Sequence, residues 1–249
     1  MDWGKRFDQQ VKWTAGIRQY LFTQIRPDQN THILEVGCGP GSVLVETEHL
    51  EYKLSCGLDC SMPFLHQAKT RLSRTSLVGG DALHLPYADS SFGIIYCHYF
   101  LLWVDAARVL AEMSRITCDN GWIIALAEPD YMARIDYPPP LDELGKKQMQ
   151  ALQHQGATID QGRQLNHLFL NAELTEVQSG YLGSVWKSNE AMIGFEEEWQ
   201  MLQLDLELYE NPEILAYYRQ VDFQARQTGA RILCVPTFYA IGQVRKQFT

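Results

Sequence analysis

Three glycines and two aspartates recur at a regular spacing in the first third of the chain. Gly37, Gly39 and Gly41 directly follow an apolar run. Asp59 stands 22 residues after Gly37, and Asp81 stands another 22 residues further on. A glycine turn between a strand and a helix lets a ligand approach the backbone closely and offers N–H groups at the helix start. Because a carboxylate can accept two O–H donors at once, such as the hydroxyls of a ribose, the pattern favours nucleotide binding.

Two kinds of nucleotide cofactor could explain the glycine run. Dinucleotide-binding folds use G-x-G-x-x-G for the same steric reasons, and Asp59 alone would also suit the ribose of NAD. The third glycine comes one residue early, however, and Glu35 precedes the first glycine by two residues, which matches that fingerprint poorly. Asp81 and the following Ala82 add a carboxylate for an adenine amine and a backbone N–H for a ring nitrogen. The contacts describe an adenosine, with a nicotinamide-dependent oxidoreductase as an alternative.

Alternating strands and helices must position these groups. Short apolar runs predict strands, and segments with apolar residues at helical spacing predict helices. Strands are expected at residues 33–36, 53–58, 76–80, 92–97 and 122–127, and helices at 7–25 and 62–71 and after Ser42 and Asp105. Repeated βα units with short crossovers build an α/β fold with a doubly wound parallel sheet. The glycine turn and both carboxylates therefore meet where the strands end, along one edge of the sheet.

The second half of the chain departs from this regularity after Glu128. Three prolines at 138–140 precede a polar helix expected at residues 141–155. The other expected elements are a helix near 165–172, a strand at 175–179, helices over 188–228, and one closing strand from 231 to 244 that bends at Pro236. The aromatic residues in this half could cap an apolar substrate, although ordinary helix packing also explains them.

Several segments in the first half resemble the first three motifs of Rossmann-like (class I) S-adenosylmethionine-dependent methyltransferases. The matching segments are 33–42, Gly57-Leu58-Asp59-Cys60-Ser61, Gly80-Asp81-Ala82, Leu85-Pro86-Tyr87 and Ser91-Phe92. The last two are similar to a small-molecule branch of the family, which includes the ubiquinone and menaquinone C-methyltransferases. The latter half of the chain matches no one pattern, so the resemblance does not extend to the substrate.

The resemblance implies one methyltransferase domain over residues 1–249. Its sheet would have seven mostly parallel strands with one antiparallel strand, and helical insertions would cap the carboxyl edge. Residues 30–128 would bind the cofactor, S-adenosyl-L-methionine, and segments 129–165 and 186–230 would cap the substrate. The implied cofactor contacts are Glu35, Gly37, Cys38, Gly39, Asp59, Cys60, Asp81, Ala82 and Cys97. In the leading helix, Arg18 could meet the cofactor's carboxylate while Trp13 covers its methionine end.

Methyl transfer from this cofactor needs few catalytic groups, because the sulfonium already activates the methyl group. A base is required only if the acceptor carries a proton of high pKa. The carboxyl ends of the fourth and fifth strands offer His98 as a candidate base, or a positioning residue, and Glu128 as a group that binds substrate or fixes its loop. Cys97 stands where C5-cytosine methyltransferases have a nucleophilic cysteine, but those enzymes have a proline before it and this chain has Tyr96. A covalent mechanism through Cys97 is therefore not expected. A non-catalytic module that binds S-adenosylmethionine is a second alternative.

Composition narrows the partners of the protein. The net charge of −9 and the pI near 5.2 argue against nucleic acid, since binding phosphates requires clustered Lys and Arg. The six cysteines show no zinc-binding spacing, so we expect reduced thiols and no metal site. The sequence shows neither a signal peptide nor a run of ~20 apolar residues that could span a membrane. We therefore expect a cytoplasmic protein that acts on a small molecule, with its oligomeric state open.

Overall fold

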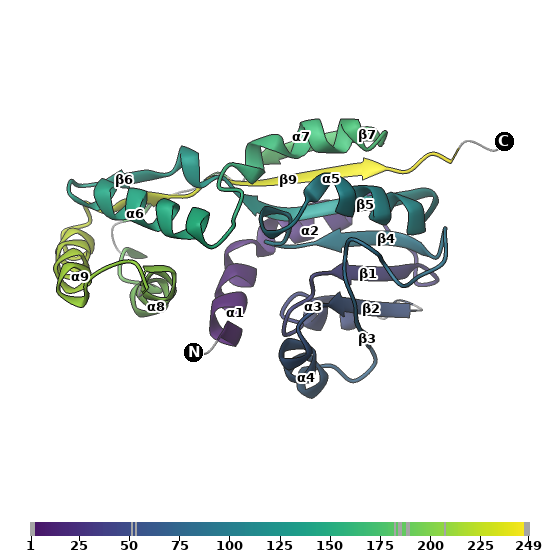
Figure 1. Ribbon diagram of the computed structural model, residues 1–249, viewed down its shortest axis with the longest axis horizontal. Coiled ribbons are helices and arrows are strands. Elements are labelled where there is room, and N and C mark those ends of the chain that lie inside the picture. Colours follow the sequence, from purple (N-terminus) through teal and green to yellow (C-terminus); the bar gives the residue numbers. More distant parts are fainter. Residues whose placement is uncertain are drawn as a thin grey trace.

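A central sheet of seven strands organises the chain in the computed structural model (Figure 1). The structure describes residues 3–50, 52, 54–181, 183, 186–187, 190–206 and 208–246, with side chains from residue 7 onward. The strand order is β3-β2-β1-β4-β5-β9-β7. The bounds are β1 His32–Val36, β2 Leu54–Asp59, β3 Ser76–Gly79, β4 Phe92–Cys97, β5 Thr117–Pro129, β7 Thr175–Tyr181 and β9 Thr237–Gln243. Residue 53, which begins one expected strand, lies outside the described residues.

The pairing of the strands confirms the predicted fold class. Strands β1 to β5 pair in parallel, and β9 is antiparallel to both of its neighbours, β5 and β7. The carboxyl ends of the parallel strands therefore share one edge, which faces the helices at the left of Figure 1.

Helices cover both faces of the sheet and explain the apolar strands. Helices α2 (Ala15–Ile25), α3 (Leu44–Glu48) and α4 (Met62–Arg71) pack on one face, and α5 (Ala106–Ile116) and α7 (Gln161–Asn171) pack on the other. In β4, Ile94 and Tyr96 join the first of these cores, whereas Ile95 and Cys97 join the second. Because the central strands are buried on both faces, they read as nearly continuous apolar runs rather than alternating ones.

The leading helix expected at residues 7–25 is instead two helices, α1 (Trp3–Trp13) and α2, which meet at Thr14. The Thr14 hydroxyl donates to the carbonyl of Gln10 at 2.9 Å, and Arg18 donates to the carbonyl of Val11 at 2.8 Å. These side chains satisfy carbonyls near the break, where the helical ladder is interrupted. The break lets α1 turn away from the sheet, so that it lies between the sheet and the helices of the cap (Figure 1).

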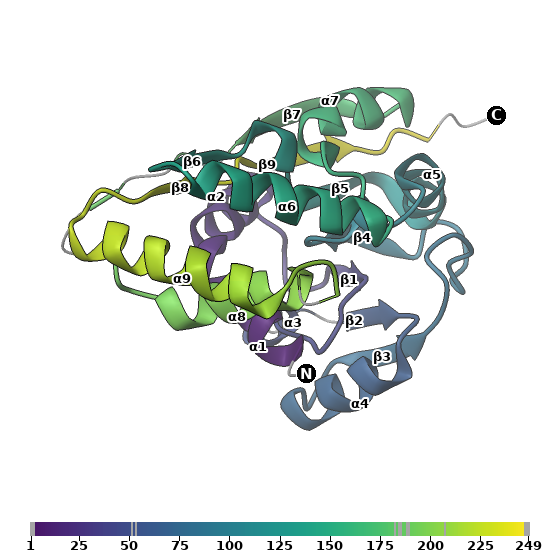
Figure 2. The ribbon, with the colours of Figure 1, turned by 60° about the vertical axis from the view of Figure 1, so that its left-hand side comes forward.

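A helical cap stands at the carboxyl edge of the parallel strands. It contains α6 (Leu141–His154), α8 (Phe195–Leu206) and α9 (Pro212–Gln227), which share an apolar core around Leu144, Trp199 and Leu215. A two-stranded sheet of β6 (Ile135–Tyr137) and β8 (Ile232–Cys234) belongs to the same end, and Figure 2 shows α9 and α8 in front of the sheet. Residues 188, 189 and 207, within a stretch expected to be helical, lie outside the described residues. No described helix is long and apolar enough to cross a membrane.

Two expected boundaries in the second half are wrong. The expected strand from 231 to 244 is two strands in different sheets, because β8 pairs with β6 whereas β9 joins the main sheet. Pro236 separates them, and its carbonyl accepts the backbone N–H of Asp130 at 2.8 Å. The first capping segment was expected to end at residue 165, but that position lies inside α7, whose Leu165 and Phe169 pack in the core beneath the sheet. This segment therefore ends before α7 begins.

Candidate functional site

The glycine turn follows β1 at the carboxyl edge of the sheet and needs glycine for two reasons. Gly37, Gly39 and Gly41 all have positive φ angles, of 71°, 51° and 78°, which side chains rarely tolerate. A Cβ on Gly37 would lie 2.2 Å from the ring of Phe100. A Cβ on Gly39 would meet nothing closer than the Phe7 ring at 3.9 Å, so a ligand has room to approach the backbone there.

Asp59 ends β2, the strand beside β1, and braces the glycine turn. One of its carboxylate oxygens accepts the backbone N–H of Gly39 at 2.8 Å, and the other accepts that of Ser61 at 2.8 Å. A carboxylate has about four acceptor sites, so two remain for further donors. This arrangement fits the binding of ribose hydroxyls, as predicted for Asp59.

Asp81 follows β3, the next strand along the same edge. One carboxylate oxygen accepts the N–H of Leu83 at 2.9 Å, and the other lies 3.7 Å from the Nδ1 of His84. The Asp81 side chain is exposed and the neighbouring Ala82 is buried. Cys60, next to Asp59, is also exposed. The sheet thus brings the predicted ribose and adenine contacts together in the order expected from the sequence.

Three other predicted contact residues are buried behind the glycine turn. Glu35 is only 2% exposed and accepts a hydrogen bond from the Tyr96 hydroxyl at 3.2 Å. Burial raises the pKa of the Glu35 carboxyl well above its ordinary value. Cys38 and Cys97 are also buried, and burial raises the pKa of both thiols. The position of Cys97 agrees with the expectation that it forms no covalent intermediate, since a buried, protonated thiol is a poor nucleophile.

Arg18 is almost fully buried and connects α2 to α3. Its Nε and one terminal nitrogen donate to the two carboxylate oxygens of Glu46, both at 2.7 Å. It also donates to the Thr14 hydroxyl at 2.6 Å and to the carbonyl of Val11 at 2.8 Å. These four bonds leave one of the five guanidinium N–H groups for the predicted contact with the cofactor's carboxylate. The geometry gives Arg18 chiefly a bracing role between the first helices and the helix after the glycine turn.

His98 lies at the end of β4 and contacts the break between α1 and α2. Its Nε2 is 2.8 Å from the hydroxyl oxygen of Thr14. Burial, together with the positive charge of Arg18, lowers the pKa of His98 to about 3. An imidazole with such a pKa stays neutral and is a weak base. The geometry therefore favours His98 as a positioning residue over His98 as a general base.

Glu128, at the end of β5, is completely buried and holds the loop after β4. One of its oxygens accepts the backbone N–H groups of Phe100 and Leu101, both at 2.9 Å, and the other accepts that of Leu102 at 3.2 Å. Burial raises the pKa of the carboxyl to about 7 against the effect of these bonds. Of the two roles considered for Glu128, the contacts support fixing the loop rather than binding the substrate.

A cavity of about 820 Å³ lies between α1, the ends of β4 and β5, and the cap. Gln10 and Trp13 of α1 and Thr14, at the break after it, belong to its wall, so the cavity approaches His98 through Thr14. Trp13, which was expected to cover the methionine end of the cofactor, faces this cavity and is 45% exposed. Residues of α8, α9 and β8 also line it. Cavities of this size suit small-molecule ligands.

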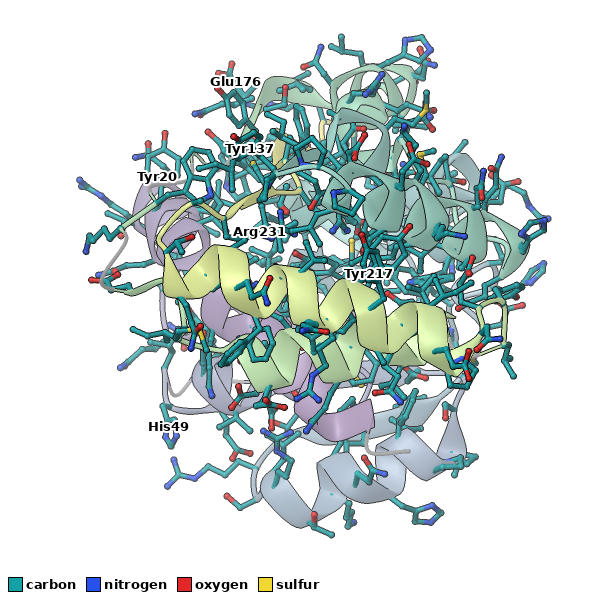
Figure 3. All side chains as sticks on the ribbon, turned by 90° about the vertical axis from the view of Figure 1, so that its left-hand side faces the viewer. Tyr20, His49, Tyr137, Glu176, Tyr217 and Arg231 are labelled. Carbon is teal, nitrogen blue, oxygen red and sulfur yellow. The ribbon has the colours of Figure 1, made fainter. Side chains whose placement is uncertain are left out.

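The cap side of the cavity contains a buried ionic network that the sequence reading missed. Asp222 accepts from Arg231 at 2.5 Å, from Arg226 at 3.1 Å and from the Trp199 indole N–H at 2.6 Å. Arg231 also contacts Asp136 at 2.7 Å. Figure 3 looks onto this end of the molecule, with α9 across the front and Arg231 labelled beside it. The four-residue spacing of Asp222 and Arg226 is a usual ion-pair signal in a helix, but the other partners lie far apart in the sequence.

Comparison with known proteins agrees with the cofactor half of the site. Residues 34–125, less than half of the chain, match the family model described as a methyltransferase domain. A segment of 98 residues is 36% identical to malonyl-[acyl-carrier protein] O-methyltransferase of Dechloromonas aromatica and covers 39% of this chain and 36% of that protein. Another segment is 30% identical to demethylmenaquinone methyltransferase of Thermotoga maritima and covers 48% and 52% of the two chains. The chain thus spans about half or less of the length of these relatives.

Solved structures extend the likeness to most of the chain at the level of fold. Geranyl diphosphate C-methyltransferase of Streptomyces coelicolor superposes with a TM-score of 0.54 at 13% identity, over 87% of this chain and 73% of that one. At this identity the likeness shows the fold alone. The match over residues 34–125 includes the glycine turn and the two strand-end aspartates, so the similarity to a methyltransferase domain lies in the part of the chain that forms this edge of the sheet.

Proposed function

We propose that this protein transfers a methyl group from S-adenosyl-L-methionine to a small organic acceptor bound in the cavity under the cap. The observation that supports this most directly is the row of groups along the carboxyl edge, from the open backbone at Gly39 to Asp59 and Asp81, with the cavity beside it. The names of the matched relatives, which are methyltransferases of two different small or carrier-bound acceptors, support the reaction class.

In this proposal, cofactor binding is divided among the strand ends. When bound, S-adenosylmethionine supplies an activated methyl group. Asp59 would accept the ribose hydroxyls, Asp81 and the N–H of Ala82 would hold the adenine, and the open backbone at Gly39 would leave room for the methionine part. The same residues suit S-adenosylhomocysteine, the expected product.

The chain's own residues then act mainly by alignment and exclusion of water. His98 is held by Thr14 and has a pKa lowered to about 3, so it positions a group by hydrogen bonding rather than taking up a proton. Glu128 fixes the loop after β4 in place. Residues 129–160 and 186–230 act as the cap, which covers the acceptor. An acceptor that needs no strong protein base suits this arrangement.

The test is calorimetric titration with S-adenosylmethionine, S-adenosylhomocysteine and NADH. We expect both sulfur ligands to bind and NADH not to bind. Binding of NADH without either sulfur ligand would instead support a nicotinamide-dependent oxidoreductase. A second experiment incubates the protein with S-adenosylmethionine labelled in its methyl group and a broad metabolite extract. If both sulfur ligands bind but no compound takes up label, a non-catalytic binding module is the better description.

We further propose that the protein works in the cytoplasm on a small molecule and not on nucleic acid. All six cysteines are free thiols, which suits a reducing compartment. The net charge of −9 opposes the binding of polyanions. Fractionation of cells that express the tagged protein would test the compartment, and a filter-binding assay with RNA and DNA at physiological salt would test the exclusion of nucleic acid.

A further inference from the structure

Helix α1 places an unsatisfied polar group in the wall of the cavity. Gln10 lines the cavity and is only 6% exposed, yet its amide oxygen Oε1 is enclosed and has no hydrogen-bond partner among the described residues. Burying an amide oxygen without a hydrogen bond destabilises the folded protein. A residue retained in this state can recover that loss when a ligand supplies a donor. Because the Gln10 side chain borders the cavity, a turn of this side chain would bring the oxygen to a donor on a molecule that enters the cavity.

The position of Gln10 connects it with the reacting end of the site. It lies four residues before Thr14, whose hydroxyl donates to the Gln10 carbonyl at 2.9 Å, and both residues line the cavity. Thr14 in turn contacts His98 at the end of β4, next to the loop that Glu128 holds. A molecule that reaches the Gln10 amide thus extends toward the edge where the cofactor contacts are arranged.

The charges of the cavity wall restrict the ligand further. Among the described lining residues, every cationic side chain already contacts an acidic one. The pairs are Arg134 with Asp136, Arg226 with Asp222 and Glu198, Arg231 with Asp136 and Asp222, and Lys187 with Glu190 at 2.9 Å. A carboxylate or phosphate in the ligand would meet only cations whose charge an acid already balances, and to take one of the buried cations as its own partner it would have to break that pair. Breaking a buried pair is strongly unfavourable, since it leaves one charge uncompensated.

We propose that Gln10 binds the methyl acceptor, and that the acceptor is an uncharged or cationic molecule with an apolar body and an O–H or N–H group that donates to the Gln10 amide oxygen. The apolar body packs against Trp13 on α1 and Trp199 on α8, which both line the cavity. This inference rests on the proposed function, because it takes the cavity as the acceptor site. It excludes phosphorylated and carboxylate-bearing acceptors.

Three matched probes test this preference: 2-phenylethanol, 2-phenylethylamine and phenylacetate. They share a phenyl ring and differ in a hydroxyl, an ammonium and a carboxylate. Each is titrated calorimetrically at millimolar concentrations into the protein, with and without saturating S-adenosylhomocysteine. We expect the alcohol and the amine to bind at least about tenfold more tightly than phenylacetate. Equal or tighter binding of phenylacetate, or no binding by any of the three, would overturn the proposal.

The variant Gln10→Leu tests the role of the amide itself. It should weaken binding of the alcohol and the amine by about tenfold and leave the affinity for S-adenosylhomocysteine unchanged. The matched control is Gln9→Leu, since Gln9 is the neighbouring residue and does not line the cavity. Unchanged affinities in Gln10→Leu would refute the assignment.

Thermal unfolding separates recognition from a structural role. Because Gln10→Leu removes a buried oxygen that has no partner, its Tm should equal or exceed that of the parent protein. A clear fall in Tm would mean that the amide has a structural partner, and the proposal would fail. If S-adenosylhomocysteine does not bind the parent protein, the proposed function fails, while the comparison of the three probes without it still decides the ligand preference of the cavity.

Discussion

Replacement of Asp59 by alanine tests the cofactor site most directly. The carboxylate accepts two backbone N–H groups, from Gly39 and Ser61, each at 2.8 Å. It has acceptor sites left for the ribose hydroxyls, and the loss of such charge-assisted bonds costs roughly 1–3 kcal/mol of binding free energy. This corresponds to a loss of about 5- to 150-fold in affinity for S-adenosylhomocysteine. Asp59→Asn keeps one acceptor oxygen, so its loss should be smaller than that of Asp59→Ala.

Asp28→Ala is a matched control for this substitution. Asp28 precedes β1 at the opposite edge of the sheet and also accepts two local hydrogen bonds, from the Asn30 N–H at 2.8 Å and the Thr31 hydroxyl at 3.2 Å. Loss of the Asp28 carboxylate perturbs a turn of similar size but leaves the carboxyl edge of the parallel strands intact. Calorimetry with S-adenosylhomocysteine gives the affinities, and urea unfolding shows whether each variant is folded. An affinity of Asp59→Ala equal to that of the parent protein, in a folded variant, would refute the assignment of Asp59 to the ribose.

Three further predictions follow from the packing of the site. Glu128→Ala leaves three N–H groups without an acceptor, two of them buried, so urea unfolding should show a loss of about 3 kcal/mol in the free energy of unfolding; an unchanged midpoint would contradict the bracing role. Because the pKa of His98 is lowered to about 3, the imidazole stays neutral above that pH, and the pH–rate profiles of the parent and His98→Asn should have the same shape. An inflection near neutrality that disappears in His98→Asn would show that His98 is a base. Gly37→Ala places a Cβ 2.2 Å from Phe100 at a positive φ, so it should lower Tm and weaken S-adenosylhomocysteine binding; a variant as stable as its parent would contradict this.

The first half of the fold could be predicted because its signals are local. Each βα unit contains its own apolar strand, its turn and the group at the strand end, so Gly37, Asp59 and Asp81 are visible as a spacing in the sequence. The break at Thr14 and the separation of β8 from β9 are different. They depend on side chains that satisfy carbonyls and on strands that find partners far away in the chain, and short apolar runs carry no information about either.

The roles of His98 and Glu128 were left open by the sequence for a related reason. Their place after strands β4 and β5 is evident from the order of elements, but whether each titrates, positions or braces depends on what surrounds it. Glu128 meets three N–H groups of the loop after β4, and His98 meets the hydroxyl of Thr14, 84 residues earlier, at the break between α1 and α2. The state of an ionisable group is set by its burial and its neighbours, which only the packed structure supplies.

The sequence by itself determined the fold class and the placement of Gly37, Asp59 and Asp81 at strand ends, because these groups repeat with the period of the βα unit. Only the tertiary structure shows the cavity in which we propose that the acceptor binds. The cavity, the enclosed Gln10 oxygen and the paired charges around Asp222 join α1, the strand ends and the cap, which are far apart along the chain. The proposed cofactor contacts are therefore encoded locally, whereas the cavity is a property of packing between distant segments.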